Sequence, residues 1–541
     1  MNVKNYPDFF NNVFGPIMQP GSSTHTAGPA RMGYMCNSLL GEEDEVSEIL
    51  AIMDPDGSFC GTFGMMTEDL GILTGALGHL PDWEFLFEAK EVCEEKGVKF
   101  NFSFSDMKES THPNAIKFVL KGKSGRVVSL VANSTGGGMI ETVIVNDYPF
   151  HSIGESFVIC VFDKEDKLEG SELERSMIEK FDIYAHDISR AESKGKMLWF
   201  RTSYNPDKKE IKNVVGDLEF SVMYPVLPVV TRREKKEQLF NTVEGMRKLA
   251  ESQNKRMSEI AIEYEMNSSC WSREDVIEYM EKTVAATMHR RTHAIYEEEM
   301  ESFYRPYLTD YYKMYEEFRV NKGNDLLAGP TIGLAYKYLL GGKPFVPGLL
   351  YVPGPQGSGG GYVYAALSAV KEIHGYSNED LLRGLFVAAA VGSTAYSNCD
   401  PTAEAIGCAG DAGMVCSFIA AGLTEMMGGT PKQVEWACSL ALQSFIGIVC
   451  DYFPGGDENP CQSRMFVAVG MGIVFSELAT VGINPVIPFH EVVDTAASVG
   501  SKIPSDLRCT ARGGLCLTPT ALKLKNLNQI ALEELEKSKN K

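Results

Sequence analysis

The stretch from Leu326 onward constrains the fold of this chain most, because Gly, Ala and small apolar residues dominate it. Helix-breaking groups recur within it, as in Gly-Gly-Lys-Pro at 341–344 and Gly-Gly-Thr-Pro at 428–431. Small side chains let helices pack closely, and helical periodicity begins directly after the charged link Thr231 to Gln238. We therefore expect a compact all-helical domain over residues 236–541.

The N-terminal part has a different pattern, with short apolar or alternating runs that are typical of strands. A helix is expected at Asp82 to Lys96, which Gly97 follows. These features predict an α+β domain over residues 1–150. A small βαββ module is expected over residues 151–228, from the segments Ser156 to Phe162, Ser171 to Lys180, Asp182 to Ile188 and Lys196 to Thr202. The strands expected in the first domain are Glu48 to Met53, Ile116 to Leu120, Val127 to Val131 and Thr142 to Val145.

The charge of the chain bears on its partners. The formal net charge is -21 at pH 7, so the surface repels phosphate backbones and anionic lipid. The most apolar long run, Met465 to Ile483, contains Glu477 and is expected to be a buried helix rather than a membrane span. We expect no nucleic-acid partner and no membrane partner.

Thirteen cysteines are spread over the chain, and no basic stretch followed by an apolar core is visible at its start. Disulfides rarely persist in the cytosol, so this usage predicts reduced thiols and a cytoplasmic location. Most of these cysteines are expected to pack as small apolar residues, and some are candidates for metal binding.

Two loops are candidates for ligand binding. In Gly21 to Pro29, hydroxyl residues flank His25, whose imidazole is suited to accept a proton; the alternative is a helix cap with an exposed histidine. The glycine-rich loop Gly354 to Gly361 precedes a helical run, and its free N-H groups suit an anion such as a carboxylate. The alternative for this second loop is a flexible connection between helices.

A third candidate site is formed by cysteines beside Gly and Pro. Cys408 lies in Gly-Cys-Ala-Gly-Asp, and Cys450 and Cys461 flank the segment Asp451 to Pro460. Exposed thiolates on such loops suit an iron-sulfur cluster, and three of them leave one iron open to a substrate oxygen. From spacing alone, a zinc site or buried free cysteines explain the pattern equally well.

These motifs together resemble iron-sulfur-dependent L-serine dehydratases. Gly21 to Pro29, Thr111 to Asn114 and Ser134 to Gly138 resemble segments of the family's β part. The surroundings of Cys408, Cys450 and Cys461, and the closing segment Leu507 to Thr520, resemble the α part. The chain looks like a fusion of the two parts, with an ACT-like regulatory module at 151–228 between them.

The resemblance implies a [4Fe-4S] cluster and a lyase that converts L-serine, or a close 3-hydroxy amino acid, to pyruvate and ammonia. It also implies a small amino-acid substrate and a homodimer. Its implied residues are Ser22, Ser23, Thr24 and His25 for catalysis, Ser358, Asn398 and Arg464 for substrate binding, and Cys408, Cys450 and Cys461 as metal ligands.

The sequence also departs from the family pattern within Gly57 to Asp69, where Gly64 stands for a lysine and Met66 for a histidine. A thioether cannot transfer protons, so another group must do so if that histidine takes part in catalysis. Two alternatives follow: a lyase for another small substrate such as cysteine, and a cluster-bearing sensor without catalysis. Cys509 and Cys516 are further thiols in the closing segment, where packing is the first expectation.

Overall fold

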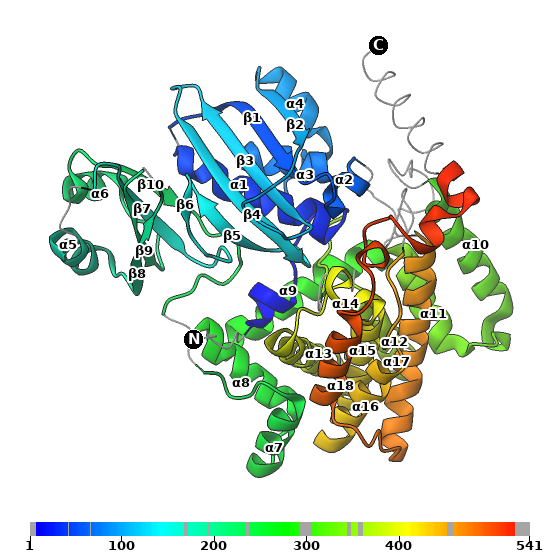
Figure 1. Ribbon diagram of the computed structural model, residues 1–541. Helices are drawn as coiled ribbons and strands as arrows, with labels where there is room; N and C mark the ends of the chain where they lie inside the picture. Colours follow the sequence, from blue (N-terminus) through cyan, green and yellow to red (C-terminus); the bar gives the residue numbers. More distant parts are fainter. Residues whose placement is uncertain are drawn as a thin grey trace. The chain divides into compact units, whose positions relative to one another are not determined.

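A computed structural model describes residues 7–41, 43–64, 66–166, 171–192, 194–233, 237–292, 306–342, 348–354, 361–451 and 458–524 (Figure 1). The chain divides into two compact units. One comprises residues 21–236, and the other combines residues 1–20 with residues 237–541. Sheets lie in the first unit and helices make up the second, which confirms the expected α+β region followed by a helical region.

The first unit contains a six-stranded sheet in the order β2-β1-β3-β4-β5-β6. Strands β1 and β2 are parallel and the other neighbours are antiparallel. Its strands are β1 (Val46–Met53), β2 (Lys99–Phe104), β3 (Ala115–Gly122), β4 (Val127–Gly136), β5 (Met139–Val145) and β6 (Tyr148–Pro149). The four expected strands correspond to β1, β3, β4 and β5. Every second residue of β3 is buried, as expected for a strand whose two faces differ in solvent exposure.

Helix α1 packs against β3 and β4 and crosses α3 at very short range (Figure 1). A Cβ atom added at Gly33 would lie 2.8 Å from the Ala76 nitrogen, and one at Gly75 would lie 2.1 Å from the Ala30 oxygen. Only glycine permits this approach, which holds the residues before α1 beside those before α3. The helices of this region are α1 (Gly28–Leu40), α2 (Ser58–Thr62), α3 (Glu68–Ala76) and α4 (Ala89–Glu95), with short turns η2 (Ser23–Ala27) and η3 (Leu86–Glu88). The helix expected at Asp82 to Lys96 is confirmed only in its second half.

The second sheet of this unit is antiparallel, in the order β10-β7-β9-β8. Its elements follow the chain order βαββαβ rather than the expected βαββ. The missed helix α6 has only two buried residues, Ile211 and Val215, and the missed β10 is a five-residue edge strand, so both carry a weak sequence signal. The elements are β7 (Phe157–Asp163), α5 (Ser171–Phe181), β8 (Ala185–Arg190), β9 (Lys196–Thr202), α6 (Lys208–Val215) and β10 (Glu219–Met223).

The second unit is built around α15, in which every residue is buried. Helices α13, α16 and α17 pack directly on it (Figure 1). A Cβ at Gly384 of α13 would lie 2.8 Å from the Gly422 oxygen of α15, so glycine pairs bring these two helices together. The longer helices are α7 (Val243–Gln253), α8 (Met257–Ser269), α9 (Arg273–Thr292), α10 (Pro306–Lys322), α11 (Gly329–Gly341), α12 (Tyr362–His374), α13 (Asn378–Asn398), α15 (Ala412–Met426), α16 (Pro431–Gln443), α17 (Ser463–Val481) and α18 (Phe489–Gly500). The short ones are η1 (Phe9–Val13), η5 (Gly323–Asp325), α14 (Ala403–Ile406), η7 (Gly407–Ala409), η8 (Glu458–Gln462), η9 (Ser505–Leu507) and η10 (Gly514–Leu517).

The N-terminal segment 7–20 belongs to this helical unit, which the sequence patterns do not suggest. The Phe9 ring stacks on Tyr264 with centroids 5.2 Å apart, and the Phe9 N-H donates to the Glu265 carboxylate at 2.7 Å. Met18 and Tyr351 exchange both backbone hydrogen bonds, at 2.9 and 3.0 Å. The segment is therefore an integral part of the helical core rather than a free arm.

One helix in the described part of the chain, Pro460–Val481, is long and apolar enough to cross a membrane. The bent pair α14–α15 passes the same criteria only if it is taken as one span. Half of the apolar window of Pro460–Val481 is buried inside the protein, and core helices of soluble proteins share this length and composition. A helix is therefore confirmed where one was expected at Met465 to Ile483, and about half of it is buried.

Candidate functional site

Three chain segments meet at Cys408 and Cys450. Cys408 lies in the turn η7 between α14 and α15, and its N-H donates to the Ile448 oxygen at 2.8 Å. A Cβ on Gly407, which has a φ of +68°, would lie 2.5 Å from that same oxygen. The Cys450 N-H donates to Leu507 at 2.8 Å, and Cys450 accepts from the Cys509 N-H at 2.9 Å. Backbone hydrogen bonds, rather than side-chain packing alone, therefore hold these cysteines together.

The thiols themselves converge. Cys408 and Cys450 are hydrogen-bonded through their side chains, and their sulfur atoms and an Asp411 oxygen all lie within 4.8 Å of one another. Cys461 lies in η8, directly before α17, and its charge contributes to the raised pKa of Cys450. The structure thus brings Cys408 and Cys450 together, which the spacing alone did not require, and the role of Cys461 as a ligand stays a prediction.

The hydrogen bond with Cys450, together with burial, raises the pKa of Cys408 well above that of an ordinary thiol. The Cys408 hydrogen bond lowers the pKa of Cys450, but a hydrogen bond to Cys509 and burial outweigh it, so the net shift is upward. Without metal these thiols are protonated at neutral pH. Metal binding must displace their protons, so the site is expected to load better as the pH rises.

Arg464 lies in the first turn of α17 and points into this cysteine site. Its guanidinium donates to the Val449 oxygen at 2.9 Å, to the Cys408 sulfur at 3.5 Å and to the Asp451 carboxylate at 2.7 Å. The other Asp451 oxygen accepts from the Leu515 N-H at 2.9 Å. Arg464 and Asp451 therefore tie the two cysteine loops to the closing segment, and Asp451 is a site residue that the motifs had not singled out.

The other two substrate-binding candidates of this unit are Asn398 and Ser358, and the structure assigns no ligand contact to either. Asn398 is the last residue of α13, and its amide donates to Thr394 at 2.7 Å and to Asn241 at 2.9 Å. Ser358, with most of its glycine-rich loop, lies outside the described residues. Their roles stay predictions.

The second candidate site, in the first unit, surrounds His25. Ser22 caps η2, and His25 is buried, with Nδ1 3.2 Å from the Ser22 hydroxyl and Nε2 3.1 Å from the Ser58 hydroxyl. Ser23 and Thr24 are also buried, so the loop is not an exposed helix cap. The Thr24 oxygen accepts from the Ser134 hydroxyl at 2.7 Å.

Three sequence motifs thus form one polar cluster: the Gly21–Pro29 loop, the Gly57–Asp69 segment and Ser134. Thr26 bonds the Thr67 hydroxyl at 2.6 Å and the Met66 oxygen at 2.9 Å. Met66, which stands where the family pattern has a histidine, is therefore held in this cluster through its backbone oxygen. Ser58 was missed as a site residue, although it stands inside a motif that the resemblance had already marked.

Glu68 is a second residue that sequence reasoning missed. It is fully buried, its carboxylate accepts from the Thr62 hydroxyl and the Met66 N-H, and burial raises its pKa well above that of an ordinary carboxyl group. Such a carboxyl group can remain protonated near neutral pH and donate a proton. The sequence signal that could have identified Glu68 was its position two residues after Met66, inside a segment that the resemblance had marked.

Burial lowers the pKa of His25 to about 4. Because the unfolded chain binds this proton near pH 6.5, stability from the neutral imidazole is fully present above that pH and is lost as the pH falls toward 4. Between about pH 7 and about pH 4, we expect the free energy of unfolding of the wild type to fall by about 3 kcal/mol more than that of a His25→Gln variant. Urea unfolding of both proteins across this range measures the difference, and parallel pH curves would contradict the assignment.

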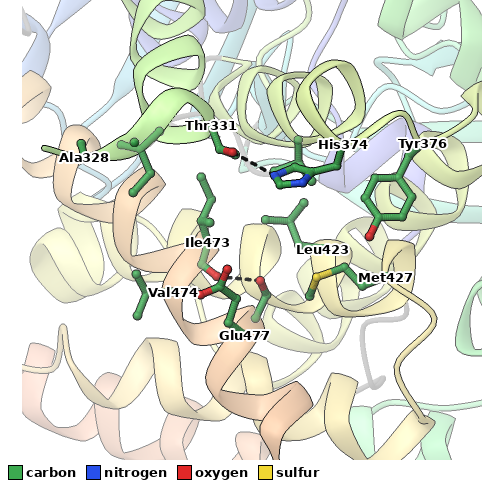
Figure 2. A pocket seen from close by; sticks show the side chains of 13 residues that line it. Ala328, Thr331, His374, Tyr376, Leu423, Met427, Ile473, Val474 and Glu477 are labelled. Carbon is green, nitrogen blue, oxygen red and sulfur yellow. Dashed lines mark hydrogen bonds between the residues drawn. The ribbon is translucent and has the colours of Figure 1, made fainter. Parts of the chain in front are cut away.

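A separate cavity of about 300 Å³ lies among the helices of the second unit (Figure 2). His374 Nε2 is 2.9 Å from the Thr331 hydroxyl on its rim, while Glu477 lies across the cavity. Leu423 and Ile473 supply apolar walls. None of the sequence-predicted site residues lines it, so it is distinct from the cysteine site.

The part of this chain that is similar to known proteins contains the cysteine site. The family model for the serine dehydratase alpha chain matches residues 353–516. A probable L-serine dehydratase alpha chain from Latilactobacillus sakei is 30% identical over 171 residues, which cover 32% of this chain and 82% of that protein.

Two further relatives are matched over smaller shares. The probable L-serine dehydratase alpha chain of Bacillus subtilis is 35% identical over 170 residues, covering 31% of this chain and 57% of that relative. L-serine dehydratase 2 of Escherichia coli is 31% identical over 168 residues, covering 31% of this chain and 37% of that protein. The chain thus spans little more than half of the Bacillus subtilis relative.

Proposed function

Since this chain belongs to the L-serine dehydratase family, we propose that it is an iron-sulfur-dependent lyase that converts L-serine to pyruvate and ammonia. The observation that carries the proposal is the convergence of the Cys408 and Cys450 thiols and Asp411 within the matched segment, with Cys461 near enough to affect the pKa of Cys450. Three thiols beside one cationic side chain, Arg464, suit an anionic metal-sulfur centre better than a packed core.

The donor set fits the proposed [4Fe-4S] cluster. Cys408, Cys450 and Cys461 would hold it, and their sulfur ligands are the type that iron-sulfur clusters require. When bound, the cluster would supply a Lewis-acidic iron that polarises the substrate's hydroxyl group. Arg464, which donates to Cys408, would neutralise part of the thiolate charge and could bind a substrate carboxylate beside it.

The proposed reaction also needs a base for the α-proton. His25 is neutral at physiological pH because burial lowers its pKa to about 4, so a ring nitrogen is available to accept a proton. The hydroxyls of Ser22 and Ser58 would orient its ring and fix the tautomer. We propose that Ser22, Ser23, Thr24 and His25 are catalytic residues of this reaction.

The middle module is proposed to be regulatory. Its βαββαβ order and its core between the sheet and the two helices suit an ACT-like domain. A homodimer and a cytoplasmic location are part of the same proposal.

A related lyase for another small substrate, such as cysteine, is the second candidate. The observation that favours it is the loss of the family's lysine and histidine at Gly64 and Met66, of which Met66 contacts the His25 loop through its backbone oxygen. A β-thiol would leave in place of a hydroxyl.

Anaerobic reconstitution with iron and sulfide, followed by assays with serine, threonine and cysteine, tests both candidates. We expect keto-acid and ammonia release to be fastest with serine. Faster turnover of cysteine would favour the second candidate. An intact cluster with no turnover of any of the three would contradict both and leave a cluster-bearing sensor.

A further inference from the structure

A cavity among the helices of the second unit has a charge opposite to that of the whole chain. It measures about 630 Å³ and lies where α8, α9 and α13 begin. More cationic than acidic side chains line it, although the chain has a formal net charge of -21. Such a local excess of positive charge attracts anions. The cationic residues are Lys255, Arg256, Arg273 and Arg383, and the acidic ones are Glu259 and Glu379.

Both carboxylates that line this cavity already have partners. Glu259 accepts the backbone N-H of Arg256 at 2.9 Å and so caps the start of α8. Glu379 forms an ion pair with the Arg383 guanidinium at 3.1 Å. Lys255 is likewise paired, at 2.6 Å, with a glutamate of α8. Two of the four cations are therefore neutralised by their own neighbours.

Arg256 and Arg273 are the other two cations, and both side chains are exposed. Neither guanidinium forms an ion pair with any residue that the structure describes. Arg256 acts on the carboxylates of Asp380 and Glu425 through its charge. Asp380, however, pairs with the arginine of its own helix, and Glu425 accepts from the Ser258 hydroxyl at 2.7 Å. The cavity thus presents two guanidinium groups to a ligand.

The cavity also has an apolar wall, and its volume lies within the range of small-molecule sites, about 300 to 1,000 Å³. Guanidinium groups bind phosphate oxygens through paired hydrogen bonds. A phosphate monoester carries close to two negative charges at neutral pH, which matches two arginines better than the single charge of a carboxylate does. The apolar wall consists of Ile262, Ile277, Leu382 and Phe386.

This cavity is separate from the cysteine site. Helix α15 begins directly after Asp411, which lies beside Cys408 and Cys450, and its last turn contains Glu425, which holds Ser258 of the cavity wall. The two ends of a helix of this length are about 20 Å apart. A ligand in the cavity is therefore not the substrate of the cysteine site.

We infer that this cavity binds a small phosphorylated molecule with an apolar part, whose phosphate group is held by Arg256 and Arg273. The inference is independent of the proposed function, because none of the cysteines lines the cavity. Binding requires no metal centre and can be measured whether or not the chain turns over serine.

The probe is phenyl phosphate, which joins a phosphate dianion to an apolar ring. Benzoate, with the same ring and a single charge, is the comparison. Isothermal titration calorimetry of the full chain at low ionic strength should show binding of phenyl phosphate and at least tenfold weaker binding of benzoate. Arg256→Gln and Arg273→Gln should each weaken phenyl phosphate binding by about tenfold, because each removes a charge-assisted hydrogen bond.

Arg175→Gln is the matched control, since it removes an exposed arginine from α5 in the other unit. Its affinity for phenyl phosphate should equal that of wild type. Absence of binding by wild type, or equal affinity of wild type and both cavity variants, would overturn the inference. Benzoate binding as tight as that of phenyl phosphate would overturn the choice of a phosphorylated ligand.

A second measurement needs no variant. Phenylglyoxal modifies exposed arginines, and peptide mass spectrometry identifies the modified positions. Phenyl phosphate should protect Arg256 and Arg273 in the wild type from modification and leave Arg175 unprotected. Equal modification of all three arginines with and without phenyl phosphate would contradict the site.

Discussion

Cys450→Ser is expected to leave the protein without a stable iron-sulfur cluster. Cys450 is the central residue of the site, since its sulfur lies within 4.8 Å of the Cys408 sulfur and its backbone pairs with the closing segment. A serine hydroxyl is a much poorer ligand for iron than a thiolate. We expect bound iron and acid-labile sulfide to fall on the order of tenfold or more after anaerobic reconstitution.

Cys416→Ser is the matched control, because it makes the same exchange at a buried cysteine of the same helical unit. It is expected to keep its iron even if it unfolds more easily. Circular dichroism spectra of both variants separate loss of the cluster from loss of the fold. A folded Cys450→Ser protein with full iron content would show that Cys450 is not a ligand.

His25→Gln is expected to have the second largest effect, on turnover rather than on the cluster. Glutamine retains polar atoms near Ser22 and Ser58 but cannot act as a base at neutral pH. General-base catalysis typically contributes a factor of about 10² to 10⁴, so kcat for serine should fall by that order. Iron content, measured on the same samples, should be unchanged.

His79→Gln provides the comparison for this second variant. His79 stacks on Trp83, with centroids 4.1 Å apart, and lies in the same unit outside the polar cluster around His25. Its kcat should remain close to wild type. Equal turnover by His25→Gln and wild type would show that His25 is not the base.

The elements that could be predicted from sequence are those with a regular apolar pattern. Strand β3 alternates buried and more exposed residues and was predicted individually, whereas α15 was covered only by the expectation of an all-helical domain. Strand β2 was missed because it is partly or fully exposed along its whole length. Helix α3 was missed because glycines interrupt its apolar pattern, although those glycines are what allow it to cross α1.

The site could be predicted only as far as its local motifs reached. Cys408, Cys450 and His25 stand in short segments whose residue types indicate their chemistry. The contact between Cys450 and Cys509 depends on backbone pairing between distant segments, which periodicity does not encode. The burial of Glu68 likewise arises from tertiary packing, so a sequence alone gives no measure of its raised pKa.

The seating of residues 7–20 in the helical unit has a consequence for how the chain can be divided. The helical unit takes aromatic side chains such as Phe9 from residues that precede the α+β unit in the sequence. A cut in the link near residue 236 would leave Phe9 and its neighbours on the other fragment, where they would act as a docking peptide for Tyr264 and Glu265. The boundary between the two halves of this protein is thus crossed twice by the chain, and no single break separates them cleanly.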